Sequence, residues 1–469
     1  PCPAISPTVG SASLETSSLQ RAMIVTHLAS PHQNIFLLSM LWNLRGPLDA
    51  ARFEAAWQRV VQATPMLRTR FDIHAHPQPR QVVEPTASVR FDFDDHLGLC
   101  SDAAEYDALA QETMRRERAE PVRLDVAPLL RLRLLRFARE QHTLVLTIHH
   151  IIEDGWSLRL LLKAVQLCYN QPGTPLPAPP SYEVKLAHEA KMSAAGSPAE
   201  LFWRQAMLGL PPARKLLGVQ PGCADQQAVA IRRSITVDSP LLQQLRALAG
   251  EERVTLAAIC HAAWAIVQWA FEGSDAEESV FGCVLGGRSS QVPHLSDVIG
   301  PVMNTVPLRA AVGATATAAA VARGVNHSLG QSRPYAAYPL TKIKQLCAKR
   351  GRGDLFHTIV DYQSAAWGMD LEGGVTADPP TIFDRIGTPL TLRFSIAPGR
   401  SGSQTNMPHA APSPSTSLNV VATSECDALG AAFLDVLLAA TLHTLRRLAT
   451  SPQATVAEIV AAMPIPPDP

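Results

Sequence analysis

Residues 148–157, which read Ile-His-His-Ile-Ile-Glu-Asp-Gly-Trp-Ser, join two segments of different hydrophobic periodicity. The preceding residues 142–148 are rich in Thr, Val, Leu and Ile and predict a buried strand. The following residues 156–169 carry leucine and valine at helical spacing and predict an amphipathic helix. Turn and capping residues, Asp154, Gly155 and Ser157, lie between the two. The sequence therefore places two imidazoles, two carboxylates and a glycine at one strand end, between two apolar elements.

Length and composition limit the class of protein. A chain of 469 residues is too long for one ordinary core and predicts two lobes. With 46% hydrophobic and 17% charged residues, it can bury a large core. Lys+Arg and Asp+Glu both number 41, so the charge gives no indication of a nucleic-acid or membrane partner. No apolar run reaches the roughly 18 residues of a membrane span, and the first residues are not typical of a signal peptide.

The eight cysteines are scattered, and none form a CxxC pair. Several lie within apolar strand or helix patterns. We therefore expect reduced cysteines that act as small core residues, and a cytoplasmic protein.

A proline-rich segment at residues 171–180 cannot be helical and predicts a semi-rigid linker. We place the lobe boundary just after it. Residues 1–185 then form an N-terminal lobe that carries the paired histidines. Residues 186–469 form a C-terminal lobe with a Gly-Pro-Val-Met-Asn-Thr stretch at 300–305 and a closing strand and helix. Strand and helix patterns alternate in both parts, so the predicted fold class is α/β.

Several short motifs point to one family. Residues 149–155 fit the HHxxxDG signature of acyltransferases that act on thioesters. Residues 18–23 (SLQRAM), 66–71 (MLRTRF), 287–288 (GR) and 299–309 (IGPVMNTVPLR) resemble further motifs of nonribosomal peptide synthetase condensation domains, in the family's order and spacing. The resemblance covers nearly the whole chain, and the style of residues 300–301 and 338–340 is typical of fungal members.

The resemblance implies a fold, partners and an activity. The fold would be two chloramphenicol-acetyltransferase-like lobes in a V-shaped pseudo-dimer with a central tunnel. Substrates would arrive on the phosphopantetheine arms of upstream and downstream peptidyl carrier proteins, with no cofactor bound directly. The excised domain would be a monomer beside neighbouring synthetase domains. The activity would be amide formation, in which an acceptor amine attacks a carrier-bound acyl or peptidyl thioester.

Three departures and one absence refine this interpretation. Bacterial members usually read Arg-His-Glu before the LRT strand, whereas this chain reads Ala-Thr-Pro at 63–65. Terminal ring-closing fungal members usually have Ser in place of the first histidine, whereas His149 is retained. Epimerisation relatives usually read Ser-Trp after the Gly-x of this motif, whereas residues 156–158 of this chain read Trp-Ser-Leu. The aspartate-rich motif of heterocyclising relatives is absent. The first departure leaves open which arginine pairs with Asp154. The retained His149 and the Trp-Ser-Leu order favour ordinary peptide-bond formation.

The residues allow the chemistry of amide formation. A neutral His150 imidazole can accept a proton from the attacking amine or hold it in line, and the sequence does not separate these roles. His149 fits either a partner that fixes the loop or an ordinary core histidine. Asp154 is expected to be an ion-pair partner that shapes the loop. Gly155 permits close backbone approach, and an N–H at the helix start can face the oxyanion.

Other polar residues are assigned from the same motifs. Trp156 and Ser157 are expected to shape the site, and Glu153 is expected to be solvated. Arg68 is the first candidate for the partner of Asp154, with Arg309 and Arg70 as rivals. Asn304 is expected to be a loop residue that bonds the backbone. Adjacent strand residues point to opposite faces, and no HExxH or Cys/His spacing occurs, so we expect no metal.

Two alternatives stay open. A terminal condensation-like domain would cyclise or release a carrier-bound peptide. A catalytically silent domain would only dock carriers or partner enzymes.

Overall fold

The computed structural model describes residues 12–99, 102–210, 230–273, 277–348, 354–364, 368–397, 416–426 and 429–464. Its contacts divide the chain into two compact units. Unit 1 comprises Pro1–Ala194, Gly286–Met303 and Trp367–Ile386, and unit 2 comprises Ala195–Leu285, Asn304–Ala366 and Gly387–Pro469. Two segments from the second half of the sequence therefore belong to unit 1. The predicted lobe boundary after residue 185 lies inside α5 (Glu183–Met192), which unit 1 contains whole.

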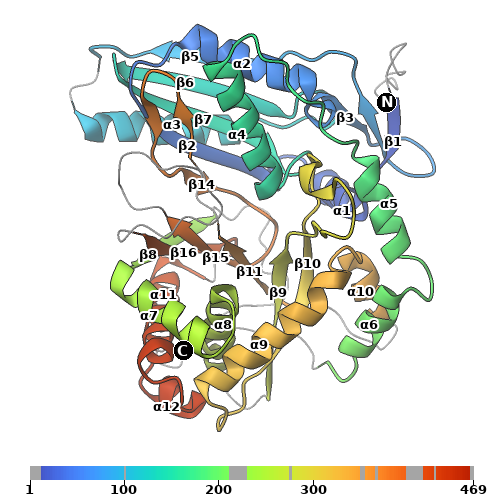
Figure 1. Cartoon of the computed structure of the whole chain (residues 1–469), viewed down its shortest axis with the longest axis vertical. Helices are drawn as coiled ribbons and strands as arrows, with labels where there is room; N and C mark the ends of the chain where they lie inside the picture. Colours follow the sequence, from blue (N-terminus) through green and yellow to red (C-terminus); the bar gives the residue numbers. More distant parts are fainter. Residues whose placement is uncertain are drawn as a thin grey trace. The chain divides into compact units, whose positions relative to one another are not determined.

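Unit 1 is built on a seven-stranded sheet (Figure 1) with the order β12-β13-β2-β7-β6-β5, in which β14 also pairs with β2. Its strands are β2 (Leu37–Arg45), β5 (Arg90–Asp95), β6 (Leu130–Ala138), β7 (Gln141–His149), β12 (Asp370–Leu371), β13 (Val375–Ala377) and β14 (Thr381–Phe383). A smaller sheet has the order β1-β4-β3, formed by Ala12–Glu15, Arg80–Val83 and Thr69–Asp72. The helices are α1 (Ser18–Ala29), α2 (Ala50–Ala63), α3 (Ala103–Ala119), α4 (Gly155–Asn170) and α5.

Strand alternation sends side chains to both faces of the large sheet of unit 1. Trp42 and Leu44 of β2 belong to the core formed with α2 and α4, which pack together (Figure 1). Leu41 points the other way and packs with Met114 of α3. Helices thus cover both faces, and β7 is buried between them along its length apart from its first residue. The strand that carries His149 is therefore held from two sides.

Unit 2 contains a six-stranded sheet with the order β10-β9-β11-β15-β16-β8. Its strands are β8 (Ile231–Val237), β9 (Glu278–Leu285), β10 (Asn304–Ala311), β11 (Thr358–Gln363), β15 (Leu390–Ala397) and β16 (Ser417–Ser424). Its helices are α6 (Pro198–Ala206), α7 (Ser239–Glu251), α8 (Leu256–Phe271), α9 (Ala318–Ser332), α10 (Leu340–Ala348), α11 (Ala431–Thr450) and α12 (Val456–Ala461).

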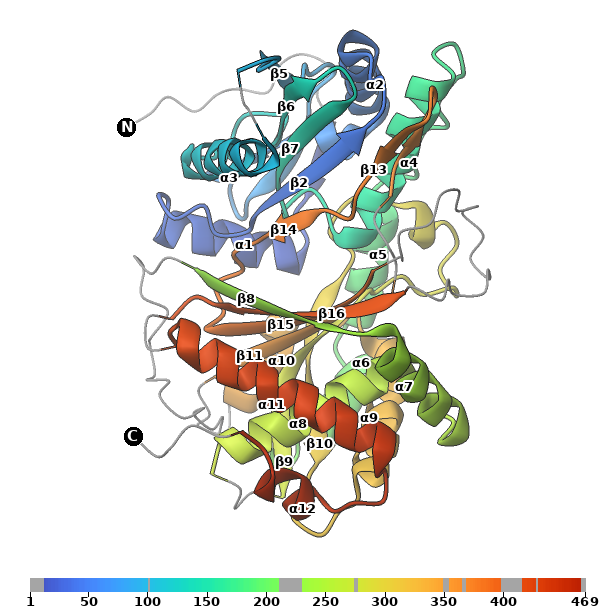
Figure 2. The ribbon, with the colours of Figure 1, turned by 90° about the vertical axis from the view of Figure 1, so that its left-hand side faces the viewer.

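Helix α8 is apolar around most of its circumference, which is typical of a helix in the middle of a core. It packs against α9, α11 and the sheet, and Figure 2 shows α11 lying along the same side of that sheet. The predicted α/β class is confirmed in both units. The V-shaped arrangement of the lobes and the tunnel stay predictions.

One local prediction was wrong. Residues 66–71 resemble the LRT strand of the family, which predicts a strand throughout, but Pro65–Arg68 is a short 3-10 helix and β3 begins at Thr69. Proline at the first position favours this turn because its ring fixes φ in the helical range. The turn places Arg68 at the end of a helix and not on a strand.

The cysteines follow the prediction in part. Cys168, Cys260 and Cys283 are free and buried, and Cys347 is buried as well, as expected of small core residues. Cys426 is disulfide-bonded, so the expectation of reduced cysteines was wrong there. Sequence spacing cannot exclude a disulfide, because its formation depends on how closely a fold places two cysteines.

No single helix among the described residues is long and apolar enough to cross a membrane. The bent pair Ser239–Glu251 and Leu256–Phe271 passes the test of length and composition when taken together.

Candidate functional site

The predicted strand-to-helix junction is present in unit 1. Strand β7 ends at His149, and α4 begins at Gly155 with Asp154 as its N-cap. The backbone N–H of His149 donates to Leu129 O at 3.1 Å, and that of His150 donates to Phe36 O at 2.9 Å. Neighbouring backbone therefore holds both histidines at the strand end.

The imidazole of His149 lies inside the core of unit 1, where the residue is 1% exposed. Its Nδ1 accepts the backbone N–H of Ile151 at 3.0 Å. Burial lowers the pKa of His149 to about 3, with smaller contributions from the charges of His150 and His27. The ring is therefore neutral at pH 7, and because Nδ1 accepts, its proton is on Nε2. This geometry matches the alternative in which His149 fixes the turn.

The side chain of His150 is 16% exposed, and its Nδ1 lies 2.5 Å from Oε1 of Glu153. The expectation that Glu153 is solvated was wrong, since its side chain is 0% exposed. Both residues belong to the tight turn after β7. That turn is closed by the N–H of Ile152 donating to His149 O, at 3.1 Å. The turn folds Glu153 inward against the imidazole instead of outward to water.

Burial raises the pKa of Glu153, whereas the neighbouring His150 lowers it and the carboxylates of Asp154 and Asp384 raise it. Sequence reasoning did not include Glu153 in the site. A signal was present in the flanking Ile151 and Ile152, which indicate a buried turn, and in the three-residue spacing from His150.

Asp154 is 2% exposed and accepts hydrogen bonds from five donor groups. Its Oδ1 accepts the N–H and hydroxyl of Ser157, both at 2.8 Å. Its Oδ2 accepts the N–H groups of Val302 at 2.9 Å and Met303 at 3.1 Å. Both oxygens accept Nη2 of Arg288, at 2.8 and 3.0 Å. The carboxylate therefore joins the start of α4 to the segment 286–303.

Arg288 is the ion-pair partner of Asp154, and its side chain is 7% exposed. Its Nη1 donates to Leu295 O at 3.0 Å and to Val298 O at 2.7 Å. The GR turn was recognised in the sequence, but its arginine was not among the proposed partners. Because Gly286–Met303 belongs to unit 1, this arginine reaches a residue that lies 134 positions earlier.

The three arginines proposed as partners of Asp154 lie elsewhere. Arg68 donates to the carbonyl oxygens of Gln62 at 3.1 Å, of Pro85 at 3.0 Å, and of Glu84. Arg70 pairs with Glu84 at 2.6 Å. Arg309, in unit 2, pairs with Glu278 at 2.7 Å and donates to the carbonyl oxygens of Ala206 and Leu208. These side chains stabilise local structure, so assigning one of them to Asp154 was wrong.

Two glycines near the Asp154–Arg288 pair allow other parts of the chain to pack close to the backbone. Gly287 has φ +66°, and a Cβ there would meet Val302 O at 2.3 Å. Gly300 has φ +137°, and a Cβ there would meet the Tyr182 ring at 2.6 Å. Ser157 Oγ accepts the N–H of Gly300 at 3.0 Å. These positions need glycine both for conformation and for space.

The other predicted residues have simpler surroundings. Gly155 is the first residue of α4. The Trp156 ring is about half exposed, donates its N–H to Ser296 O at 2.8 Å, and lies beneath the Arg159 guanidinium. Asn304 begins β10 in unit 2 and donates to the carbonyl oxygens of Ala336 and Tyr338. It bonds the backbone as predicted, from a strand and not from a loop.

Among the described residues, no group of three or more His, Cys, Asp or Glu side chains could hold a metal ion.

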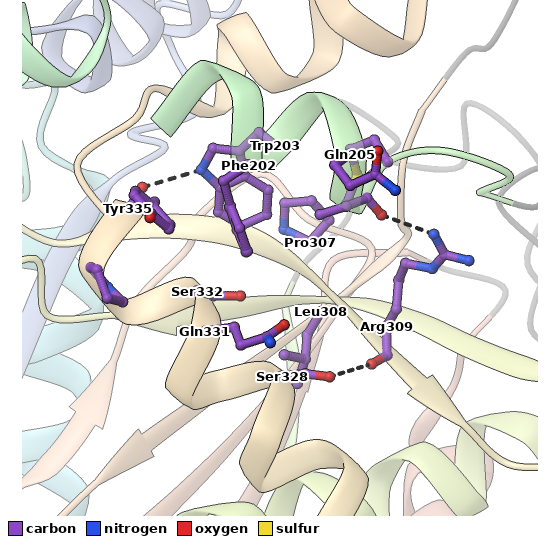
Figure 3. Close-up of a pocket in the computed structure, with 13 residues that line it drawn as sticks. Phe202, Trp203, Gln205, Pro307, Leu308, Arg309, Ser328, Gln331, Ser332 and Tyr335 are labelled. Carbon is purple, nitrogen blue, oxygen red and sulfur yellow. Dashed lines mark hydrogen bonds between the residues drawn. The ribbon is translucent and has the colours of Figure 1, made fainter. Parts of the chain in front are cut away.

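Unit 2 has a hollow of about 550 Å³ beside the edge strand β10 (Figure 3). The aromatic rings of Phe202 and Tyr335 stack in its wall, and Trp203 donates its N–H to Tyr335 O at 3.2 Å. Arg309 lines it as well. None of the residues of the His149–Ser157 stretch lines this hollow.

The comparisons with known proteins point in one direction. The sequence model of one family, described as Condensation domain, matches residues 11–380. Chondramide synthase cmdD of Chondromyces crocatus is 30% identical over 376 residues, which cover 79% of this chain and 9% of that protein. A linear gramicidin synthase protein of Brevibacillus parabrevis is 28% identical over 390 residues, which cover 82% of this chain and 8% of that protein. The chain thus spans less than a tenth of the length of these two relatives.

Solved structures share the fold at low identity. The first condensation domain of the CDA synthetase has a TM-score of 0.77 and 22% identity, covering 95% of this chain and 98% of that one. The X-domain in complex with OxyB from teicoplanin biosynthesis has a TM-score of 0.72 and 17% identity, covering 97% of this chain and 99% of that one.

Proposed function

Since the chain belongs to the condensation domain family of nonribosomal peptide synthetases, we propose that it joins an acceptor amine to a carrier-bound acyl or peptidyl thioester. The observation that carries the proposal is the His150 imidazole, which is partly exposed at the end of β7 and held by a turn. That turn is fixed to segment 286–303 by the pair of Asp154 and Arg288. A rigid imidazole of this kind suits the positioning of a nucleophile and the transfer of its proton.

The reaction needs no bound cofactor of the domain itself. The amine nitrogen attacks the thioester carbonyl, and the resulting tetrahedral adduct collapses with cleavage of the C–S bond. One proton leaves the amine nitrogen, and the departing thiolate takes one up. Nε2 of His150 can carry that proton, and general-base help of this kind contributes roughly 10²–10⁴-fold.

The developing oxyanion needs a hydrogen-bond donor. The N–H of Ser157 is already donated to Asp154. An oxyanion role for the N-terminus of α4 would therefore fall to the N–H of Gly155 or Trp156.

We also propose that the acyl groups travel on phosphopantetheine arms of upstream and downstream peptidyl carrier proteins, in the cytoplasm. The supporting observation is the similarity to chondramide and linear gramicidin synthases, of which this chain matches only a short part. Further domains of such a synthetase would supply the carriers.

Two alternative functions differ from amide formation between two carrier-bound substrates. A terminal domain would cyclise or release one carrier-bound peptide, and the retained His149 argues against the ring-closing fungal subclass. A silent domain would only recruit a partner. The similarity to the X-domain found with OxyB keeps that hypothesis open, whereas the intact HHxxxDG stretch argues against it.

The test offers the protein an acyl-pantetheine donor and an aminoacyl-pantetheine acceptor from a panel of side chains, and identifies products by mass. Intermolecular amide that depends on both thioesters supports the proposal. Cyclic product from a peptidyl-pantetheine donor alone supports the terminal hypothesis. No product from any pair, given by a protein whose circular dichroism shows that it is folded, supports the silent hypothesis.

A further inference from the structure

The amide-forming reaction proposed above assigns no role to the close contact between His150 and Glu153. Nδ1 and Oε1 are 2.5 Å apart, and the Glu153 side chain is fully buried. Apart from this contact, neither carboxylate oxygen of Glu153 has a hydrogen-bond donor among the described residues. A buried carboxylate without further donors is expensive to maintain for structural reasons alone. Among the described residues, the His150 imidazole is the one donor group that contacts this carboxylate.

We infer that Glu153 is a positioning residue that holds His150 with the proton on Nδ1, so that Nε2 is the nitrogen that receives a proton from the acceptor amine. This rests on the function proposed above. Glu153 does not itself touch the reacting atoms, and its effect passes through the imidazole.

The proton count at a 2.5 Å contact limits the possible states. With Glu153 ionised and His150 neutral, Nδ1–H donates to the carboxylate and Nε2 carries the basic lone pair. With Glu153 protonated, the acid donates to Nδ1 and the imidazole proton moves to Nε2, where it blocks the base. Only the first state accepts a proton from an amine. After acceptance, the carboxylate faces an imidazolium and stabilises its charge.

The surrounding charges act on this pair from several elements. The carboxylate of Asp154, on the same turn, is neutralised by Arg288. Burial is the main cause of the raised pKa of Glu153, and Asp384, which follows β14, adds to it. His149 is a neutral neighbour. The pair titrates as a unit, so its apparent pKa belongs to both groups. Activity should therefore appear as the pair loses its shared proton, on the acid side of the pH profile.

Replacement of Glu153 should move the pH profile of activity in a defined direction. The carboxylate favours the protonated imidazole, so without it the imidazole releases its proton at lower pH. The acid limb of kcat/KM should move to lower pH in Glu153→Gln and Glu153→Ala, while the plateau falls. Loss of the outer partner of a metal-bound histidine costs roughly 10–100-fold, and we expect a loss of the same order here. The loss should lie mainly in kcat, because Glu153 does not contact the substrate.

The experiment measures kcat and KM against pH with pantetheine thioesters for the wild type, Glu153→Gln and Glu153→Ala. Glu117→Gln is the matched control, since Glu117 of α3 is also buried and pairs with Arg131 and Arg133 away from the site. It should destabilise the protein without moving the acid limb. In a His150→Ala background, Glu153→Gln should cause no further loss of turnover, because the two act as one unit.

Two results would overturn the inference: an unchanged acid limb in Glu153→Gln, or an equal loss with and without His150. A second measurement does not depend on turnover or on folding of the variants. In wild-type protein with isotopically labelled histidine, the nitrogen NMR signals of neutral His150 should show Nδ1 protonated. A protonated Nε2 there would reject the role of Glu153. If instead Nδ1 is protonated but no amide forms from any thioester pair, the proposed function fails and the inference about the tautomer stands.

Discussion

Asp154→Asn is the substitution that tests the role of Asp154 most sharply. Every partner of the carboxylate is a donor: Arg288, two groups of Ser157, and the N–H groups of Val302 and Met303. Asparagine offers one acceptor oxygen and one NH2 donor. If its oxygen takes the place of Oδ1, its NH2 meets the two backbone N–H groups. If it takes the place of Oδ2, its NH2 meets Arg288 and Ser157.

The expected magnitude follows from these contacts. Each buried donor left unsatisfied costs about 1–3 kcal/mol. Breaking a buried ion pair by removing one charge costs about 3–5 kcal/mol, and Arg288 is buried with Asp154. These terms overlap and do not add, so we expect a loss of roughly 3–5 kcal/mol in the free energy of unfolding. For a cooperative unit of 150–250 residues this lowers Tm by roughly 6–20 °C.

Asp49→Asn is the matched control. Asp49 is the exposed N-cap of α2 and accepts the N–H of Arg52 at 3.0 Å. Asparagine and aspartate cap helices about equally well, so this variant should stay within about 0.5 kcal/mol of wild type. Urea unfolding and Tm by circular dichroism compare the two variants. If Asp154→Asn melts like Asp49→Asn, the argument from buried donors is wrong. If it is also inactive, Asp154 takes part in the reaction directly.

Two further predictions concern stability. The pKa of His149 falls from 6.5 to about 3 on folding. Between these pH values the unfolded chain binds a proton at this histidine that the folded chain does not bind. The free energy of unfolding should therefore fall by up to about 5 kcal/mol as the pH drops through that window. His149→Asn, which can keep an acceptor for the Ile151 N–H but does not titrate, should flatten this dependence in urea titrations; an unchanged slope would refute it. Gly287→Ala should cost about 2–4 kcal/mol, since its Cβ adds a clash with Val302 O to the left-handed strain. Gly98→Ala, with φ +74° and open space, should cost only about 1–2 kcal/mol, and equal losses would show that the clash is relieved.

Local patterns predicted the scaffold of the site well. The strand expected at 142–148 is β7 (Gln141–His149), and the helix expected at 156–169 is α4 (Gly155–Asn170). The family resemblance drawn from short motifs is confirmed by the match over residues 11–380. The strand and the helix depend on periodicity and capping, which neighbouring residues determine.

Contacts between distant segments were the part that the sequence did not reveal. The partner of Asp154 is 134 residues away, on a segment that leaves the second half of the chain to join unit 1. Arg68 was proposed from its place in the motif at residues 66–71, but it lies in the turn after Pro65 and donates to backbone carbonyls. Glu153 was missed for a local reason. A charged residue in a turn usually faces water, whereas this turn lies in the core of unit 1 together with its own Ile151 and Ile152.

The central claim is that His150 carries the reaction, and the turnover of His150→Ala tests it most directly. Circular dichroism first shows that the variant is folded. The amide formed from an acyl-pantetheine and an aminoacyl-pantetheine is then measured for the wild type and for His150→Ala. The rate of the same reaction without protein is subtracted. We predict that the variant loses at least roughly 100-fold in turnover. A smaller but clear loss would favour positioning of the amine over obligatory proton transfer. Wild-type turnover by the folded variant would contradict the assignment of the site to His150.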